Sequence, residues 1–390
     1  MTPSVYLDHN ATTPLRPQAI AAMRRAMECV GNPSSVHRHG RLARRLVEDA
    51  REQVAELIES DPANIVFTGS GTEANALALR CTGLRRVLVS AVEHASVLQA
   101  LVSAEIIPVN TDGMVRLDAL AAMLEASEEP ALVSVMLANN ETGVLQPLSD
   151  IVLLARRHGA LVHCDAVQAV GKVTVNFRTL GVHLLSLSAH KLGGPAGTGA
   201  LAVDAGIPLT PLVRGGGQER GRRAGSENVI GIVGFGAAAQ VARGLGDSVR
   251  LAGLRDGLER RIRAISPSVR LFGAGAERLP NTTCMEMPGI AGETQVIAFD
   301  LAGISLSAGA ACSSGKVTAS HVLKAMGFGE DIARTVVRVS MGWTTKAADI
   351  DRFIEVWTGI YGRSRACQSA SAAPVGVAAA FSAGLEKVTG

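Results

Sequence analysis

LLSLSAHKLGGP, at residues 184–195, carries the strongest structural signal in this chain. Its apolar first half predicts a short strand buried on both faces, and the glycines and proline that follow predict a turn. Lys191 therefore lies just past the end of a buried strand, where loss of water lowers the pKa of an amine and frees it to act as a nucleophile. A lone lysine beside a turn is more often an ordinary surface residue. Whether Lys191 is a surface residue or a nucleophile in a site therefore depends on which residues lie near it in the fold.

Short apolar runs of the same kind recur along the chain, each separated from the next by helical sequence. They lie at residues 65–67, 87–89, 106–109, 132–137 and 161–163. Such runs predict strands buried on both faces, and hence a mostly parallel α/β sheet covered by helices. Ligands bind at the carboxyl ends of the strands in sheets of this type. Asp165 follows one of these runs as Lys191 follows another, so both are expected at that edge.

A carboxylate and an amine at neighbouring strand ends suit a site for pyridoxal 5'-phosphate (PLP). The lysine forms a Schiff base with this cofactor, and the carboxylate keeps the ring nitrogen protonated so that the ring accepts electrons. His94, Asn140 and Gln168 also lie just past predicted strands. His94 is suited to stack on the ring or, equally, to cap the helix that follows it. Asn140 and Gln168 are candidates to hydrogen-bond to the same ligand.

Two glycine-rich stretches are candidate anion sites. Residues 68–72 follow a predicted strand and open a helix, so that free backbone N–H groups there suit a phosphate. The stretch matches neither a Walker loop nor a dinucleotide-binding fingerprint. Residues 215–226 combine glycines and arginines and end in a serine, Ser226. Each stretch is also compatible with an ordinary turn or a solvated loop.

Two residues in the C-terminal third point to chemistry beyond cofactor binding. Cys312 stands among glycine, alanine and serine alone, which predicts an accessible thiol able to act as a nucleophile. Cys164 lies in an apolar run and is expected in the core. Arg338 interrupts a predicted apolar strand, and a buried guanidinium needs either an internal carboxylate or the carboxylate of a substrate as its partner.

Composition limits the classes of function. The 390 residues are 47% hydrophobic and 19% charged, with a net charge of +3 and only 3% aromatic residues, which argues against a nucleic-acid or membrane surface. The first residues lack the charged and apolar regions of a signal peptide. Six scattered cysteines without a CxxC pair argue against a structural zinc site and a disulfide framework. We therefore expect a cytoplasmic protein.

The pattern of apolar residues changes after about residue 250. We expect a large domain over residues 15–250 and a smaller α+β domain over residues 1–14 and 251–362, with a long helical stretch from about 228 to 266 between them. The smaller domain would contain short strands at 269–272, 282–287 and 336–341 and a helix at 350–361. The Ala/Ser/Gly-rich residues 363–390 predict a tail that is partly disordered.

Seven ordered motifs resemble those of the PLP-dependent cysteine desulfurases of the NifS/IscS type, within the class V aminotransferase family. They are YLDHNATT at 6–13, NPSSVH at 32–37, Gly71-Thr72, EHAS at 93–96, NNETG at 139–143, SAHK at 188–191 and RVSMG at 338–342. The resemblance covers the chain to about residue 361. It implies PLP fold type I, the aspartate-aminotransferase-like fold, in which a mostly parallel mixed sheet covered by helices forms the large domain beside a smaller α+β domain.

The resemblance also implies a role for each candidate in binding the cofactor. Lys191 resembles the lysine that holds PLP and Asp165 the partner of its ring nitrogen. His94 would stack on the ring, while Gln168 and Asn140 would bond its oxygen. The phosphate would be held by Gly71, Thr72, Ser188 and His190, with Ser226 contributed by a second subunit of a homodimer.

The same resemblance implies the reaction. Arg338, helped by Asn140, would bind the carboxylate of L-cysteine, and Cys312 would take its sulfur as a persulfide, leaving L-alanine. The sulfur would pass to an iron–sulfur scaffold protein, with Cys312 as a transient ligand of the cluster.

Some positions depart from the family pattern. Trp343 stands where many members have arginine, and Ser226 where many have threonine. The tail also differs from that of housekeeping members, which favours a nitrogen-fixation role. Alternatives are a selenocysteine lyase or an aminotransferase on the same fold, and a non-catalytic docking protein of an iron–sulfur assembly complex. The intact set of Lys191, Asp165, His94 and Cys312 argues against the docking protein.

Overall fold

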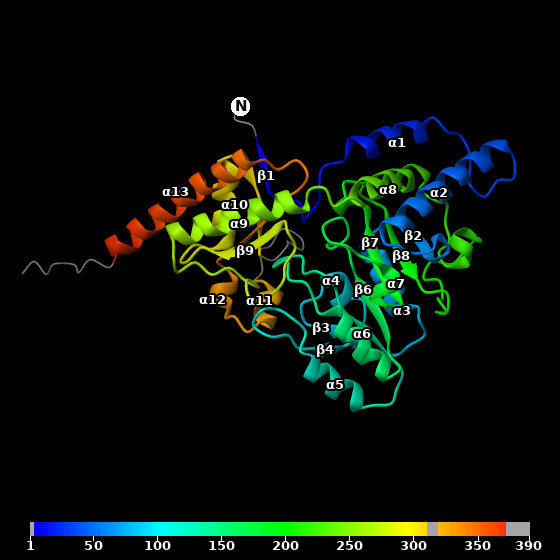
Figure 1. Cartoon of the computed structure of the whole chain (residues 1–390), viewed down its shortest axis with the longest axis horizontal. Helices are drawn as coiled ribbons and strands as arrows, with labels where there is room; N and C mark the ends of the chain where they lie inside the picture. Colours follow the sequence, from blue (N-terminus) through cyan, green and yellow to red (C-terminus); the bar gives the residue numbers. More distant parts are fainter. Residues whose placement is uncertain (1–3, 310–318, 372–390) are drawn as a thin grey trace, which may run out of the picture.

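The computed structural model describes residues 4–309 and 319–371. The larger half of the molecule, on the right in Figure 1, is built around a seven-stranded sheet. The strand order is β2-β8-β7-β6-β5-β3-β4. Neighbouring strands pair in parallel from β7 to β4, whereas β8 runs antiparallel to both β7 and β2. The predicted mostly parallel mixed sheet is therefore confirmed. The strands are β2 (Ile65–Thr68), β3 (Arg86–Ser90), β4 (Glu105–Ile107), β5 (Ala131–Ser134), β6 (Leu161–Asp165), β7 (Leu184–Ser188) and β8 (Gly199–Val203).

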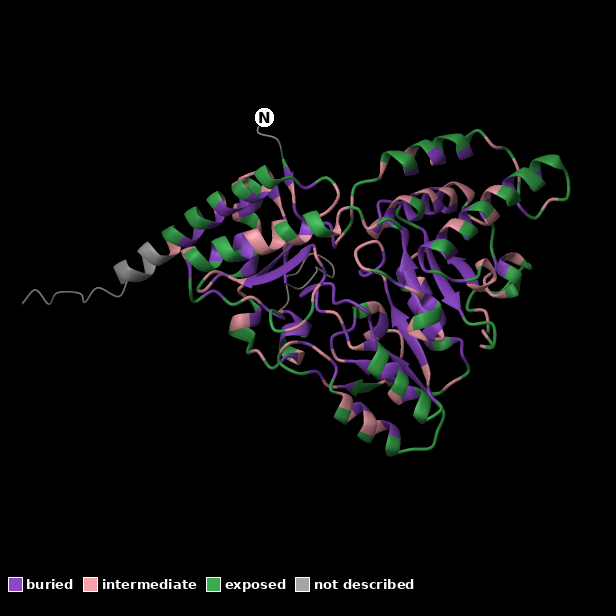
Figure 2. Cartoon of the chain, in the orientation of Figure 1, coloured by how far each residue is buried: buried purple, intermediate pink, exposed green. Residues whose placement is uncertain are grey.

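Helices cover both faces of this sheet, which is why its strands read as continuous apolar runs. In β3, Leu88 belongs to one hydrophobic core while Val87 and Val89 belong to another, as the two-residue period of a strand requires. The core on the Leu88 face contains residues of α2 (Arg38–Leu57), α5 (Leu117–Glu125), α6 (Leu148–Arg157), α7 (Phe177–Leu180) and α8 (Val229–Ala242). The other core contains residues of α3 (Gly71–Arg80) and α4 (Ala95–Leu98). Figure 2 shows the resulting buried sheet between outer helices with exposed faces.

A separate hydrophobic core lies in the smaller half of the molecule. Its three-stranded antiparallel sheet has the order β11-β12-β9, and α9, α10 and α13 contribute apolar side chains to it. Val5 and Leu7, from the start of the chain, belong to the same core because β1 pairs with β10. The elements are β1 (Val5–Tyr6), β9 (Thr282–Glu286), β10 (Ile304–Ser305), β11 (Ser307–Ala308), β12 (Val336–Ser340), α9 (Ser248–Ile265), α10 (Gly292–Leu301) and α13 (Ala347–Ser371).

The remaining elements are short. They are α1 (Pro17–Met27), which packs on α8, the helices α11 (His321–Ala325) and α12 (Glu330–Ala333), and the 3-10 turns η1 (Pro62–Asn64), η2 (Ala189–Lys191) and η3 (Gln218–Gly221). The apolar side chains of α11 and α12 join the core of the large half, although they follow β11 of the small one. The chain thus crosses back to the large half before it forms β12.

Three sequence-based expectations differ from the structure. The helical stretch 228–266 is divided into α8 and α9, because Leu245 has a positive φ of 46° between Gly244 and Gly246. The expected strand at 269–272 makes only a single bridge, Leu271 to Met285. The last helix, α13, continues to Ser371, into the segment 363–390 that was predicted to be a partly disordered tail.

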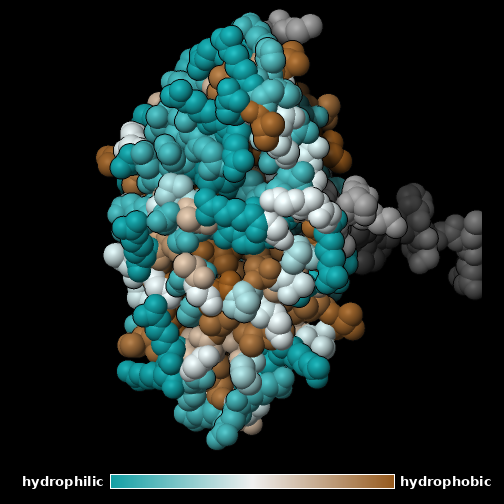
Figure 3. Space-filling model, turned by 90° about the vertical axis from the view of Figure 1, so that its right-hand side faces the viewer, coloured by the Kyte–Doolittle hydropathy of each residue, from teal (hydrophilic) through white to brown (hydrophobic). Residues whose placement is uncertain are grey.

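The surface adds two observations. Apolar side chains gather around a hollow on the face of the large half drawn in Figure 3. Within the described ranges, no helix combines the length and the apolar character needed to cross a membrane.

Candidate active site

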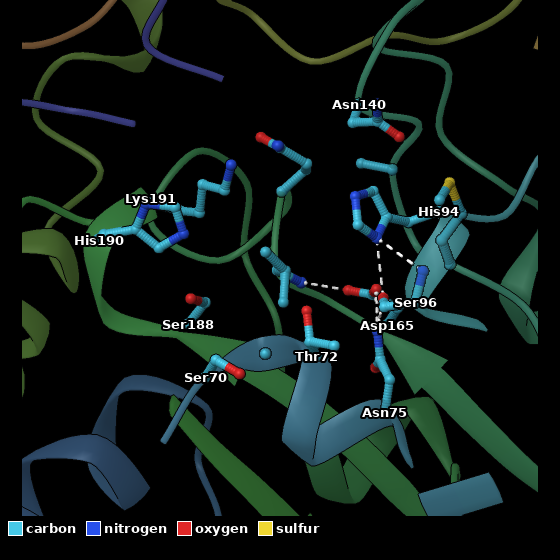
Figure 4. Close-up of a pocket in the computed structure, with 15 residues that line it drawn as sticks. Ser70, Thr72, Asn75, His94, Ser96, Asn140, Asp165, Ser188, His190 and Lys191 are labelled. Carbon is cyan, nitrogen blue, oxygen red and sulfur yellow. Dashed lines mark hydrogen bonds between the residues drawn. The ribbon is translucent and has the colours of Figure 1, made fainter. Parts of the chain in front are cut away.

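A pocket of about 270 Å³ opens at the carboxyl ends of the parallel strands (Figure 4). Nine of the residues selected from the sequence line it, because strands far apart in the chain end at the same edge of the sheet. They are Gly71, Thr72, His94, Asn140, Asp165, Gln168, Ser188, His190 and Lys191. The other lining residues are Ser70, Asn75, Ser96, Met136, Ala138 and Val167.

Asp165 ends β6 at the floor of this pocket, and its carboxylate is held in one orientation. Oδ2 accepts a hydrogen bond of 2.8 Å from Asn75 Nδ2, and Oδ1 accepts one of 2.9 Å from the backbone N–H of Val167. Asn75 Nδ2 also donates to Ser96 Oγ at 2.9 Å. Asn75 is not among the residues selected from the sequence, although its place one helical turn after Gly71 puts it on the same face of α3.

Lys191 reaches the pocket from η2, the short turn that follows β7. Its Nζ donates to the backbone carbonyls of Asn10 at 2.5 Å and Ala11 at 2.7 Å. Burial, together with the positive charge of Arg338, lowers the pKa of Lys191 from 10.5 to about 8, although Asp8 and Asp165 act in the opposite direction. The amine is thus partly uncharged near neutral pH, as a nucleophile requires.

This pKa predicts the pH dependence of covalent PLP uptake by the apo protein. Only the uncharged amine reacts, so the rate should rise about tenfold between pH 7 and 9 and then level off. An amine with the ordinary pKa of 10.5 would instead give a rise of about a hundredfold with no plateau. Stopped-flow absorbance in the visible range measures the rate. Pyridoxine phosphate, which has no aldehyde, should bind without this pH dependence.

His94 fulfils one of the two roles that its position suggested, the helix cap, and its stacking on a ring stays a prediction. It caps α4, since its Nδ1 accepts a hydrogen bond of 3.1 Å from the backbone N–H of Ser96, and it also lines the pocket. Burial lowers the pKa of His94, which favours the neutral form of its imidazole. A neutral ring fixed by its own helix cap is suited to lie against a planar ligand.

The opposite side of the pocket is built to receive an anion. Ser70 caps α3, accepting at Oγ from the N–H of Glu73 at 3.1 Å, and the start of this helix faces the pocket with Thr72 (Figure 4). A Cβ at Gly71 would lie 3.0 Å from Val167 Cγ2 and 3.2 Å from Ser188 Cβ, so glycine lets the helix approach β7 closely. Ser188 and His190 complete this side of the pocket.

The donors and acceptors around the pocket fit PLP. A helix N-terminus with hydroxyls suits its phosphate, and the carboxylate of Asp165 suits its ring nitrogen. Asn140 Oδ1 is buried and has no hydrogen-bond partner among the described residues, so this pocket-lining amide has hydrogen-bonding capacity left for a ligand.

Arg338 is brought close to the pocket but does not line it. The residue is buried in β12, where it donates to Asp8 Oδ1 at 2.7 Å and to the backbone carbonyl of Asn140 at 3.0 Å. Of the two partners that the sequence left open, this structure shows the internal carboxylate. Arg338 Nε is buried without a partner in the described part of the chain.

Ser226, like Arg338, does not line the pocket. Ser226 lines a different hollow, with Thr68, Gly69 and Arg223, so its assignment to a second subunit stays a prediction. Cys312 lies outside the described residues. The chain on either side of it is fixed: Gly309 N–H donates to Val336 O at 3.0 Å, and Ser320 Oγ donates to Glu141 Oε2 at 2.5 Å.

The chain is similar to known proteins over most of its length. The model of the family described as "Aminotransferase class-V" matches residues 5–353. A protein of Cereibacter sphaeroides named "Cysteine desulfurase" is 46% identical over 377 residues, which is 93% of this chain and 97% of the relative. The crystal structure of a NifS-like protein from Rickettsia africae is similar with a TM-score of 0.86 at 35% identity, covering 92% of this chain and 99% of that one.

A second solved structure carries a ligand in its description. It is "SspA in complex with cysteine", similar with a TM-score of 0.74 at 28% identity, over 87% of this chain and 99% of that one.

Proposed function

This chain belongs to the aminotransferase class-V family and is a PLP-dependent cysteine desulfurase, and we propose that it leaves the sulfur of L-cysteine as a persulfide on Cys312. The observation that supports this proposal is the single pocket where the amine of Lys191, the carboxylate of Asp165 and the imidazole of His94 meet. An amine of lowered pKa, a fixed carboxylate and an anion site form the set that PLP chemistry needs.

We assign a role in holding PLP to each side of the pocket. Asp165, fixed by Asn75, would hold the ring nitrogen, and His94 would stack on the ring. Gln168 and Asn140 would bond the ring oxygen. The phosphate would be held by the start of α3, with Thr72, Ser188 and His190. When bound, PLP supplies an electron sink that allows the α-proton of the substrate to leave.

The chain's own residues carry the remaining steps. Lys191, uncharged above a pKa of about 8, takes the α-proton of L-cysteine at Nζ. Arg338 and Asn140 bind the substrate carboxylate, which requires Arg338 to exchange its pairing with Asp8. The Cys312 thiolate then attacks the substrate sulfur: an S–S bond forms, the C–S bond breaks, and the proton needed to complete alanine returns to carbon. Cysteine and a thiol thus become alanine and a persulfide.

We propose a homodimer in which Ser226 serves the phosphate site of the partner subunit. Exposed apolar side chains around the loop between α1 and α2 support an interface there: Met27, Val30, Val36 and Leu42. We further propose an iron–sulfur scaffold as the sulfur acceptor, with Cys312 as a transient cluster ligand, in the cytoplasm. The tail, which differs from that of housekeeping members, favours nitrogenase maturation as the destination of the sulfur.

Measuring alanine and protein-bound sulfane sulfur on the PLP-loaded enzyme tests the reaction. Without reductant, L-cysteine should yield one alanine for each protein-bound sulfane sulfur, because the persulfide stays on the enzyme. With a thiol reductant, alanine should accumulate over many turnovers. L-serine, which has no sulfur to lose, should give no alanine. Alanine formed without sulfane sulfur on the protein, or a keto acid product, would contradict the proposal.

A further inference from the structure

Lys172 is an amine enclosed beside the pocket whose function is so far unexplained. It follows Gly171, four residues after Gln168, in the turn that leaves β6. The residue is partly exposed as a whole, but its Nζ is enclosed between the large and small halves of the molecule, close to Lys191 and Arg338. A lysine amine is seldom enclosed in this way unless a partner requires it.

The amine is bound to two side-chain amides. Lys172 Nζ donates to Gln168 Oε1 at 2.7 Å and to Asn10 Oδ1 at 3.0 Å. Because an amide offers oxygen at one end and nitrogen at the other, fixing both oxygens also fixes where both nitrogens point. Gln168 Nε2 accordingly donates to the Asn10 carbonyl at 2.9 Å, and Asn10 Nδ2 donates to the Asn140 carbonyl at 3.2 Å.

The charges around Lys172 favour an uncharged amine. Burial lowers its pKa well below 10.5, and the positive charges of Lys191 and Arg338 lower it further. Among the described ion pairs, none joins Lys172 to a carboxylate. A neutral amine still donates two hydrogen bonds. Lys172 therefore holds the two amide oxygens through directional hydrogen bonds, without needing a positive charge.

The two amides connect Lys172 to the site. Gln168 lines the pocket, and the Asn10 carbonyl accepts hydrogen bonds from both Gln168 Nε2 and Lys191 Nζ. We propose that Lys172 is a positioning residue, which fixes the amides of Gln168 and Asn10 and thereby orients Gln168 toward PLP and the Asn10 carbonyl toward Lys191. The inference rests on PLP as the cofactor and is independent of which reaction follows.

Replacing Lys172 by methionine tests the inference, with PLP affinity as the readout. Methionine keeps the length of the side chain and removes both donated hydrogen bonds. The dissociation constant of PLP, measured from the visible absorbance of the holoenzyme on dilution, should rise about tenfold. Lys346→Met, at an exposed lysine before α13, should leave it unchanged.

A double-mutant cycle separates positioning from a general loss of structure. Gln168→Met alone should also weaken PLP binding about tenfold. If Lys172 acts through Gln168, the dissociation constant of PLP in the double variant should be close to that of either single variant. The second substitution then removes an interaction that is already lost. A loss of PLP affinity of about a hundredfold in the double variant would overturn the inference, because the two effects would then be independent. Unchanged PLP affinity in Lys172→Met would overturn it as well.

Lys172→Gln is the alternative if the methionine variant fails to fold. The glutamine amide keeps a donor for one of the two acceptors, so PLP affinity should fall by about threefold. Unaltered PLP affinity would again overturn the inference. Alanine formation is measured separately. A variant can bind PLP weakly and still form persulfide when PLP is saturating. That result would show that the desulfurase reaction itself is unaffected.

Discussion

Lys191→Ala should lower alanine formation by more than about 10³-fold and remove the visible absorbance band of covalently held PLP. The substitution removes the amine that binds the cofactor and, in the proposed reaction, the base that takes the α-proton. Within residues 4–309 and 319–371, no other residue is placed to replace it: Lys172 Nζ, an enclosed amine nearby, is bound to two amides. Absorbance spectroscopy and an alanine assay provide the measurements.

The rest of the PLP site should survive in this variant. Asp165 remains held by Asn75 and the Val167 N–H, and α3 still presents its N-terminus. PLP should therefore still bind, but without a covalent bond, and be lost on dialysis. Lys324→Ala, at an exposed lysine on α11 that pairs with Glu330, is the matched control and should keep both band and activity. A preserved band in Lys191→Ala would exclude Lys191 as the cofactor lysine.

Cys312→Ser should keep the visible absorbance of bound PLP and lose alanine formation from L-cysteine, again by more than about 10³-fold. A hydroxyl is far less ionised than a thiol at neutral pH and does not form a stable bond to sulfur in place of a persulfide. After exposure to L-cysteine, the variant should carry no sulfane sulfur. Cold cyanolysis of the protein measures the sulfane sulfur, and an amino-acid assay measures the alanine.

A second cysteine provides the control for this experiment. Cys29 is a free cysteine of intermediate burial beyond the end of α1, and Cys29→Ser should behave as the wild type. Turnover retained in Cys312→Ser would exclude Cys312 as the sulfur acceptor and favour an aminotransferase or selenocysteine lyase. Loss of sulfane sulfur in Cys29→Ser would assign the persulfide to Cys29.

The sequence predicted the sheet and the strand-end residues because both leave a local signal. A strand buried on two faces reads as an apolar run, and a polar residue directly after it, such as Asp165, lies at the ligand-binding edge. The division between α8 and α9 also had a local signal in Gly244 and Gly246, which the prediction of one helical stretch did not use.

The contacts that hold the site together join residues with no local relation. Lys191 donates to a carbonyl 181 positions away in the sequence, and Arg338 pairs with a carboxylate 330 positions away. Asn75 reaches Asp165 across 90 positions. No periodicity or motif spacing encodes such pairs, because they form only when segments far apart in the chain have packed together.

The pairing of Asp8 with Arg338 has a consequence for how the protein is made. Residues near the start of the chain complete their contacts only when residues 330 positions later leave the ribosome. At typical rates of synthesis, this interval lasts roughly 15–60 s. During that time Val5 and Leu7, which later lie in the core of the small half, remain exposed on the nascent chain. We therefore expect the small half to fold last, when translation is nearly finished, and the surroundings of Lys191 to be completed with it. Until then, the exposed N-terminal segment is the place where a chaperone is expected to bind.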